Sequence, residues 1–337
     1  MMICLNRSLS QLSLQAGELY KSESFYNIYV DAFNVIGNKY ENEEYGFFDQ
    51  NPTTQYADTV VNDLFDLERK GIEKEAAVIL NVFMTVLHYL SEVVETCWTY
   101  LKIPNDSGLH NLDLAMAYYI GDDETYGDNF GGTLLYNVAE MAGERFGQDN
   151  VQTKTNSKIL ELAEKIKTEV IDAKLCHDKN TQTASYDLNF KYTQQIIQQM
   201  YVVLIQEFIH QLKEKDSDFI ELYSLALVPP IAACNPSEFD YFMNSFILSN
   251  YDDSKFTESL QHLQNVFSCF GVTCADVGEY KGGNVPQCLD AATQKFVGVF
   301  TPMYDVEKVR VSNTFSRLTY VFSRMKFTNE LSDLYFP

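Results

Sequence analysis

Glycine and proline are scarce in this sequence, with 16 Gly and 8 Pro among 337 residues. A chain with so few turn formers, a hydrophobic fraction of 46% and an aromatic fraction of 14% is neither low-complexity nor disordered. Its length is enough to bury a large core. We therefore expect a folded protein of two domains or two tightly packed repeats.

Basic residues are also few. The chain has 25 Lys and Arg against 47 Asp and Glu, a formal net charge of −22 at pH 7. This charge repels phosphate backbones and anionic lipid headgroups, which argues against nucleic acid or a membrane surface as partner. An acidic surface commonly serves only solubility, but it also concentrates cations near any site that can ligate them.

Long apolar runs are missing. The apolar stretch from Ala76 to Val86 contains Asn81 and is followed by His88, so it falls short of the roughly 18 to 20 apolar residues that cross a bilayer. Met1 to Gly17 holds only broken apolar pairs where a signal peptide has a continuous apolar centre. We expect no membrane span in this chain, and either a cytosolic protein or a start that is not the native one.

The seven cysteines form no CxxC pair, which excludes zinc-ribbon and thioredoxin-like sites. Three of them fall in the Gly-rich segment FSCFGVTCADVGEYKGGNVPQC, which is a poor core former and would profit from a cross-link. Cys269, Cys274 and Cys288 are therefore disulfide candidates, with plain buried thiols as the alternative.

Helical periodicity dominates the chain and strand signals are scarce. Between Glu73 and Leu101, for example, apolar residues recur at the three- and four-residue spacing of one face of a long helix. The segments predicted to be helical are 73–101, 112–120, 132–146, 158–173, 188–213, 219–233, 255–270 and 306–326. The predicted fold is an all-α, multi-helix bundle with an irregular Gly/Cys-rich segment near 269–290.

Helix ends can also be read from the sequence. Asp106 or Ser107 can cap the helix LDLAMAYYI, and Asn235 or Ser237 can start the helix after CNPSE. Pro229 and Pro230 are expected to break or kink the middle of the helical stretch in which they lie.

A short pattern, tyrosine followed by Asp or Asn and an aliphatic residue, recurs before three predicted helices, as FYNI, SYDL and MYDV. Duplication of a helical unit explains this better than chance, although Asp and Asn are ordinary caps. We predict a first repeat over 1–175 and a second over 181–337, with a truncated third copy from about 303. The polar segment Asp172 to Ser185 is the predicted junction.

Local catalytic signatures are absent: there is no GxSxG, HExxH, P-loop, dinucleotide-binding GxGxxG or EF-hand loop. We therefore predict that the protein is not an enzyme. Two pairs on apolar helices can ligate a metal instead, because His88 with Glu92, and Glu207 with His210, each share a helix face. The alternative for each is a structural hydrogen-bonded pair.

Tyrosine is unusually abundant, with 22 residues against one Trp. Iron(III) is a hard ion that prefers anionic oxygen, and a phenolate qualifies once the metal displaces its proton. The stretch LDLAMAYYIGDDETYGDNFGGTLLY gathers acids and phenols, of which Asp113, Tyr118 and Tyr119 are candidate ligands. Tyr223 is a further candidate. The alternative is that such tyrosines pack in the core with the hydroxyl bonded to backbone.

Several of these segments carry a family resemblance. AMAYYIGDD followed by GGTLLYNVAEMAGERFG, ELYSLALVPPIAACNPSEFDYF, and TCADVGEY with MYDVEKVRV resemble the low-iron-inducible periplasmic proteins of green algae and the diatom phytotransferrins. The likeness spans roughly Thr54 to the C-terminus. It implies a secreted or surface-held protein that takes up iron(III), with carbonate as a co-ligand. This chain departs from the family in having no visible signal sequence and no membrane anchor after Pro337.

We therefore predict that the protein binds iron(III) outside the cytoplasm, in the periplasm or the extracellular space, as part of an algal uptake system. A cell-surface uptake protein is the expected partner. A metal-free helical scaffold that offers a groove to another protein is the alternative. A helical enzyme that uses His88 and Glu92 in acid/base chemistry is a third hypothesis.

Overall fold

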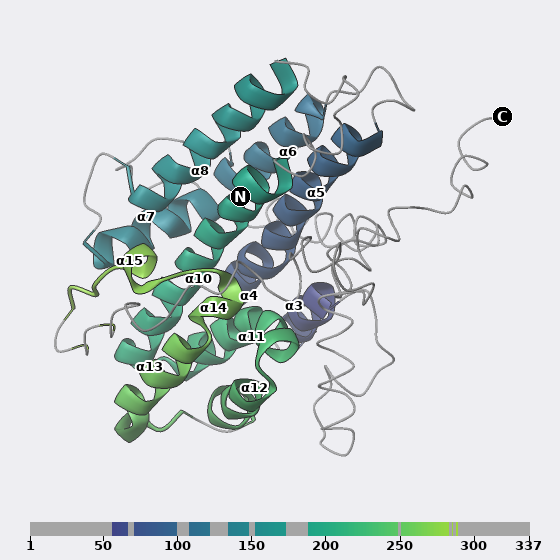
Figure 1. The fold of residues 1–337 in the computed structure, drawn as a ribbon. Coiled ribbons are helices and arrows are strands. Elements are labelled where there is room, and N and C mark those ends of the chain that lie inside the picture. The colour runs from purple at the N-terminus through teal and green to yellow at the C-terminus, as the bar shows by residue number, and fades with distance from the viewer. Residues whose placement is uncertain are drawn as a thin grey trace, which may run out of the picture.

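A computed structural model describes residues 56–66, 71–99, 108–121, 134–147, 152–172, 188–248 and 251–282, together with Val285 and Cys288. Every regular element within these ranges is a helix, which confirms the predicted all-α, multi-helix class (Figure 1). The predicted helix 306–326, the junction and most of the three Tyr-Asp/Asn patterns lie outside the described residues. Division into repeats therefore stays a prediction.

The first long helical run confirms the helix predicted from Glu73. It consists of α4 (Glu73–Ala76), the π-helical η1 (Ala77–Val82) and α5 (Phe83–Thr99), with α3 (Tyr56–Asp66) packed against η1. The portion Glu73–Val94 is in fact long and apolar enough to cross a membrane, contrary to the sequence-based expectation, but 82% of its apolar 18-residue window is buried inside the bundle. It occupies the place of a core helix.

The next helix, α6 (Leu109–Ile120), packs along α5. Its N-cap is Gly108 and not Asp106 or Ser107, which lie outside the described residues. Gly108 has φ +74°, and a Cβ there would lie 3.4 Å from the Val93 carbonyl oxygen, so a residue without a side chain suits this close turn.

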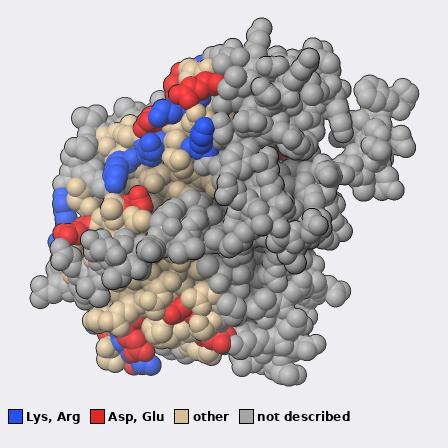
Figure 2. Space-filling model, in the orientation of Figure 1, with Lys and Arg blue, Asp and Glu red and all other residues tan. Residues whose placement is uncertain are grey.

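A pair of helices, α7 (Leu135–Arg145) and α8 (Lys154–Lys165), covers one flank of the bundle, and η2 (Ile166–Asp172) continues α8. Thr153 caps α8 by accepting a hydrogen bond from the Asn156 backbone N–H. On the face in Figure 2, basic side chains gather over α8 beside acidic ones. Glu161 pairs there with Lys158 and Lys165, exposed contacts that contribute little to stability.

The centre of the bundle is α10 (Gln194–Glu214), preceded by η4 (Leu188–Thr193). Every residue from Met200 to Ile209 is buried. Ten successive helical residues point in all directions around the axis, so α10 is enclosed rather than buried along one side as its periodicity predicted. Its neighbours are α7, α8, α11, α13 and α15.

The helix α11 (Ser217–Cys234) begins at its Asp216 cap and continues through Pro229 and Pro230. Of the two predicted outcomes, a break or a kink, the break does not occur. Each proline removes one backbone donor, but both are buried, as are the residues from Leu222 to Ile231 that surround them, and this packing stabilises the continuous helix.

The remaining helices cover the end of α10 and α11. Asn235 caps α12 (Pro236–Phe242), as one of the two predicted alternatives, and η5 (Met243–Ile247) extends it. The helix predicted over 255–270 is interrupted near Val266, giving η6 (Asp253–Lys255), α13 (Phe256–Asn265) and α14 (Phe267–Phe270). The short helix α15 (Cys274–Val277) follows and contacts α10.

The turn at Gly271 can be tested with a matched glycine. Gly271 and Gly147 have φ +69° and +76°, so alanine costs each about 1 kcal/mol in backbone strain. At Gly271 the new methyl group would also lie 2.8 Å from Gln198 Nε2, whereas at Gly147 it meets only the flexible end of Lys281 at 3.3 Å. Gly271→Ala should therefore lower the free energy of unfolding by about 1–3 kcal/mol more than Gly147→Ala, as measured in urea. Equal losses would contradict this packing.

Candidate functional site

Four ionisable side chains from four helices meet inside the bundle. Tyr223 of α11 donates its hydroxyl hydrogen to Glu75 Oε1 of α4, and Arg145 Nη1 of α7 donates to Glu207 Oε1 of α10. We call these residues the carboxylate cluster. Glu207 and Tyr223 were predicted metal ligands, and the fold adds Glu75 and Arg145.

The carboxylate cluster is largely removed from water. Tyr223 is fully buried and Glu207 is 3% exposed, while the Arg145 side chain is 32% exposed and links the cluster to the surface. Two carboxyl groups share one guanidinium here. Glu75 is half-buried and also interacts with the charge of Lys74, but its carboxyl group still adds negative charge beside Glu207, so the cluster favours protons or an added cation.

The acid–base properties follow from this burial. Desolvation raises the pKa of Glu207 to about 7, against the lowering effect of Arg145 and with a further raising effect of Glu75. Burial likewise raises the pKa of Glu75, and burial with the nearby Glu75 and Glu207 carboxyl groups raises the pKa of Tyr223 well above its ordinary value. Near neutral pH the cluster therefore holds protons that a metal ion can displace.

A segment after α14 covers one edge of the carboxylate cluster. We call residues 274–282 with Val285 and Cys288 the strap. Its Lys281 backbone N–H donates to the Arg145 carbonyl oxygen over 2.8 Å, and its Tyr280 Oη lies 2.9 Å from His210 Nδ1. Burial, and next the Arg145 charge, lower the pKa of His210. The predicted ligand His210 thus borders the cluster and contacts the strap.

The cysteine candidates lie in or beside the strap. Cys274 and Cys288 are joined by a disulfide across 14 residues of sequence. Cys269 is also disulfide-bonded. The cross-link closes the loop that carries Tyr280, in a segment with little regular structure of its own.

Three other predicted ligands lie on α5 and α6. Tyr118 stacks on Tyr89 with ring centroids 5.7 Å apart, and Tyr89 also interacts electrostatically with Glu92. His88 is the neighbour of Tyr89, and burial lowers its pKa to about 4, so its imidazole is neutral at pH 7. Thirteen residues of helical rise place His88 roughly 20 Å from Glu75. These three predicted ligands therefore do not belong to the carboxylate cluster.

Tyr119 and Asp113 belong to neither group. The fully buried Tyr119 hydroxyl donates to Asn156 Oδ1 over 2.5 Å, and Asn156 Nδ2 donates to Glu140 Oε1 over 2.6 Å. Glu140 also accepts from the Thr153 backbone N–H at 3.1 Å. This network ties α6, α7 and α8 together. Tyr119 therefore packs in the core as the structural alternative predicted, except that its hydroxyl bonds to a side chain and not to backbone. Asp113 is exposed on α6.

Within the described ranges, no group of three or more His, Cys, Asp or Glu side chains is placed to hold a metal. Glu75 and Glu207 with the Tyr223 phenol nevertheless bring three oxygen donors together. Sequence reasoning missed Glu75 and Arg145 because their contacts span 148 and 62 residues and follow no local spacing. One sequence signal could have pointed to Glu75, because it is an acid at the start of the long apolar helical run.

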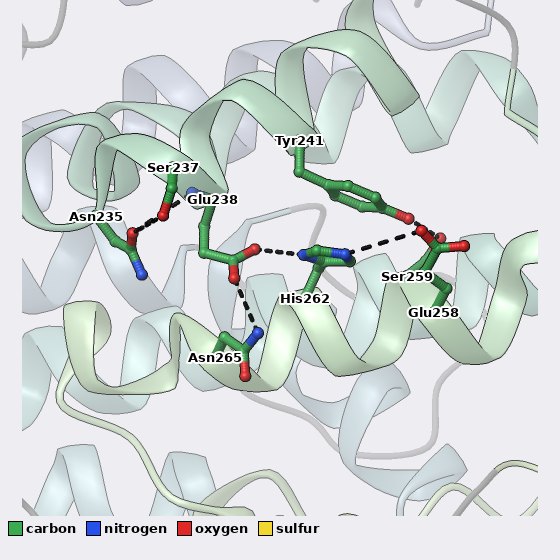
Figure 3. A network of polar contacts seen from close by, with 8 residues as sticks. All are labelled: Asn235, Ser237, Glu238, Tyr241, Glu258, Ser259, His262 and Asn265. Atoms are coloured by element: carbon green, nitrogen blue, oxygen red, sulfur yellow. Dashed lines mark hydrogen bonds and ion pairs between the residues drawn. The ribbon is translucent and has the colours of Figure 1, made fainter.

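A second polar network joins α12 to α13 (Figure 3). Glu238 Oε2 lies 2.6 Å from His262 Nδ1, and Glu238 Oε1 accepts from Asn265 Nδ2 over 2.8 Å. The Tyr241 ring stacks on the imidazole with centroids 3.5 Å apart, and its hydroxyl lies 3.2 Å from Ser259 Oγ. These contacts satisfy the polar groups locally, so the network serves to fasten the two helices.

Comparison of the chain with protein-family models, with curated proteins and with solved structures finds no match in any of the three. The chemistry of the carboxylate cluster therefore carries the functional argument.

Glu207 should make stability depend on pH. Its pKa in the folded protein, about 7, exceeds the ordinary value of 4.5, so the folded state binds the proton more tightly than the unfolded state. The contribution of the Glu207 proton to the free energy of unfolding, up to about 3 kcal/mol, is complete below pH 4.5. It is lost as pH rises towards and through 7. In Glu207→Gln, metal-free protein should therefore lose less unfolding free energy than wild type between pH 5 and 8.

His88 titrates over an overlapping range with the opposite sign, since its lowered pKa makes stability fall as pH falls from 6.5 towards 4. Both proteins contain His88, so the difference between their urea-unfolding curves isolates Glu207. Glu161→Gln removes an exposed acid and is the control. Parallel pH profiles for wild type and Glu207→Gln would show that Glu207 ionises normally.

Proposed function

We propose that the protein binds iron(III) at the carboxylate cluster, with carbonate as a co-ligand. The observation that carries the proposal is the convergence of the half-buried Glu75 carboxyl group with the buried Glu207 carboxyl group and Tyr223 phenol, beside the Arg145 guanidinium. Hard, anionic oxygen donors are the ligands that a small, highly charged ion prefers. Burial makes their protons costly to lose without a replacing cation.

Each residue has a defined part in this proposal. Glu75, Glu207 and Tyr223 provide oxygen donors, and the metal displaces the protons that their raised pKa values retain. Arg145, paired with Glu207 and partly exposed, is placed to hold a planar dianion such as carbonate through its fork of N–H groups. His210 borders the cluster as a neutral imidazole.

The proposed setting is an extracytoplasmic iron-uptake system, with a cell-surface protein as partner. The Cys274–Cys288 disulfide supports an oxidising compartment, where such cross-links persist. The net charge of −22 supports attraction of cations. The resemblance to low-iron-inducible algal proteins and phytotransferrins supports the same role.

The experiment compares two fully buried tyrosines. Adding iron(III) with bicarbonate to wild type at neutral pH should produce a visible phenolate-to-iron charge-transfer band. Tyr223→Phe should abolish the band and weaken iron binding at least about tenfold, equivalent to roughly 1.4 kcal/mol. Tyr119→Phe removes an equally buried hydroxyl from the Asn156 network and should retain both band and affinity.

Two further measurements sharpen the test. Arg145→Gln should reduce the effect of bicarbonate on iron affinity, because the proposed anion contact is lost. Elemental analysis of protein purified without chelator separates this function from a metal-free scaffold. Absence of both the band and calorimetric iron binding in wild type would overturn the proposal, and a metal-free protein that captures a partner would favour the scaffold.

A further inference from the structure

The polar network between α12 and α13 holds one imidazole in a fixed orientation (Figure 3). His262 Nδ1 lies 2.6 Å from Glu238 Oε2, and the Tyr241 ring covers one face of the imidazole with centroids 3.5 Å apart. Because an ionised carboxylate accepts hydrogen bonds and donates none, the neutral ring carries its proton on Nδ1. The lone pair of Nε2 is therefore available, and among the described residues nothing forms a hydrogen bond with that nitrogen.

A second carboxylate lies on the Nε2 side of the ring. Glu258 Oε1 is 4.0 Å from His262 Nε2, and the two residues are one turn apart on α13, so they share a helix face. Figure 3 shows Glu238 and Glu258 at opposite ends of the imidazole. The distance of 4.0 Å is too long for a hydrogen bond. It is close to the spacing of two atoms that ligate the same metal ion.

The bond lengths of zinc allow this spacing to be compared with a real site. Zinc lies about 2.0–2.2 Å from histidine nitrogen and carboxylate oxygen, so a tetrahedral angle places these two ligand atoms about 3.4 Å apart. The Glu258 side chain is 51% exposed and can rotate, so a shift of roughly 0.6 Å brings its oxygen to that distance. The fixed ring and the adjustable carboxylate together form a two-ligand site that solvent reaches.

Glu238 has the position that an outer carboxylate occupies in zinc sites. A histidine that ligates zinc commonly donates its other ring N–H to a carboxylate, which fixes the tautomer and makes the ligating nitrogen more basic. Glu238 is itself held, because its Oε1 accepts from Asn265 Nδ2 over 2.8 Å and its side chain is only 12% exposed. This observation is independent of Glu258 and points to the same ligand atom, His262 Nε2.

We propose that His262 Nε2 and Glu258 Oε1 bind a borderline divalent metal ion such as zinc, with Glu238 as the positioning residue. Water completes the coordination, since a closed structural zinc site has four protein ligands and this one has two. Imidazole suits zinc and copper, whereas calcium and magnesium take oxygen ligands. The site differs in place and in metal class from the carboxylate cluster, and it does not depend on the proposed binding of iron.

The test is a zinc titration of metal-free, full-length protein, followed by calorimetry and by long-range proton–nitrogen NMR of its five histidines. Zinc should shift the Nε2 signal of His262, assigned from its absence in His262→Gln, while Nδ1 keeps its proton. Glu258→Gln removes the charge of an exposed ligand and should weaken zinc binding at this ring at least about tenfold. His110→Gln changes an exposed histidine on α6 and is the matched control that should retain it. Calcium should leave the His262 signals unchanged.

The part of Glu238 is tested separately. Glu238→Gln keeps a hydrogen-bond acceptor of nearly the same shape and removes its charge, so the Nδ1 tautomer should persist while zinc affinity falls about tenfold. An unchanged affinity would overturn the positioning role. The tautomer distinguishes this role from a structural one, because a displaced ring would lose it.

The outcomes are separable from those of the iron experiment. Glu207→Gln alters the carboxylate cluster and should leave the zinc-induced shift of His262 in place. Zinc binding that Glu207→Gln removes and Glu258→Gln retains would locate the ion at the cluster and overturn the proposal. Absence of a zinc-induced shift at His262 Nε2 in wild type would also overturn it, and this measurement requires no variant to fold except the one used for assignment.

Discussion

Glu207 lies on a helix that is enclosed on every side, and its carboxyl group therefore has to find its partners within the protein. From Met200 to Ile209 no residue of α10 reaches solvent to a meaningful extent. A carboxylate in such a place costs several kcal/mol unless a cation, a donor or a proton compensates it. Arg145 supplies the cation from α7, and the raised pKa of Glu207 adds the proton. Helix α7 is thereby fixed against the centre of the bundle.

The same constraint acts on Glu75 and Tyr223. Their hydrogen bond connects the start of the long apolar helical run to α11, two elements separated by 148 residues of sequence. Each polar contact fixes one helix against another at a defined position, which close packing of aliphatic side chains specifies less strictly. This arrangement brings two carboxyl groups close to one guanidinium, which leaves a local excess of acidic groups. An excess of this kind is what makes the cluster receptive to a cation.

The helices could be predicted from the sequence because amphipathic spacing is a local property. Their existence was clear for the runs from Glu73 and Leu188, and Asn235 was among the expected caps. Two features differ from the expectation: the helix does not break at Pro229 and Pro230, where burial outweighs local preference, and α10 is buried on more faces than its spacing indicated. In each case tertiary packing outweighs a local rule.

The candidate site was predictable only in part. Glu207 and Tyr223 could be named from residue type, but nothing local indicates that they share a site with Glu75 and Arg145. Conversely, His88 with Glu92 and Glu207 with His210 satisfied the expected spacing, yet the two pairs lie far apart along the bundle. Helical spacing determines which residues share a face of one helix. It cannot determine which faces of different helices meet, and that meeting creates the site.

The strap makes further contacts with residues at and beside the carboxylate cluster. Arg145 and Phe146 are consecutive, yet the Arg145 side chain pairs with Glu207 of the carboxylate cluster and the Phe146 ring packs on Tyr280 of the strap. The strap contacts both, through the Lys281 backbone and the Tyr280 ring. Its disulfide closes a loop of 14 residues, which in a chain-entropy model contributes about 3 kcal/mol. A segment without a core of its own can therefore hold Tyr280 in place, so the surroundings of His210 beside the carboxylate cluster depend on a cross-link in the strap.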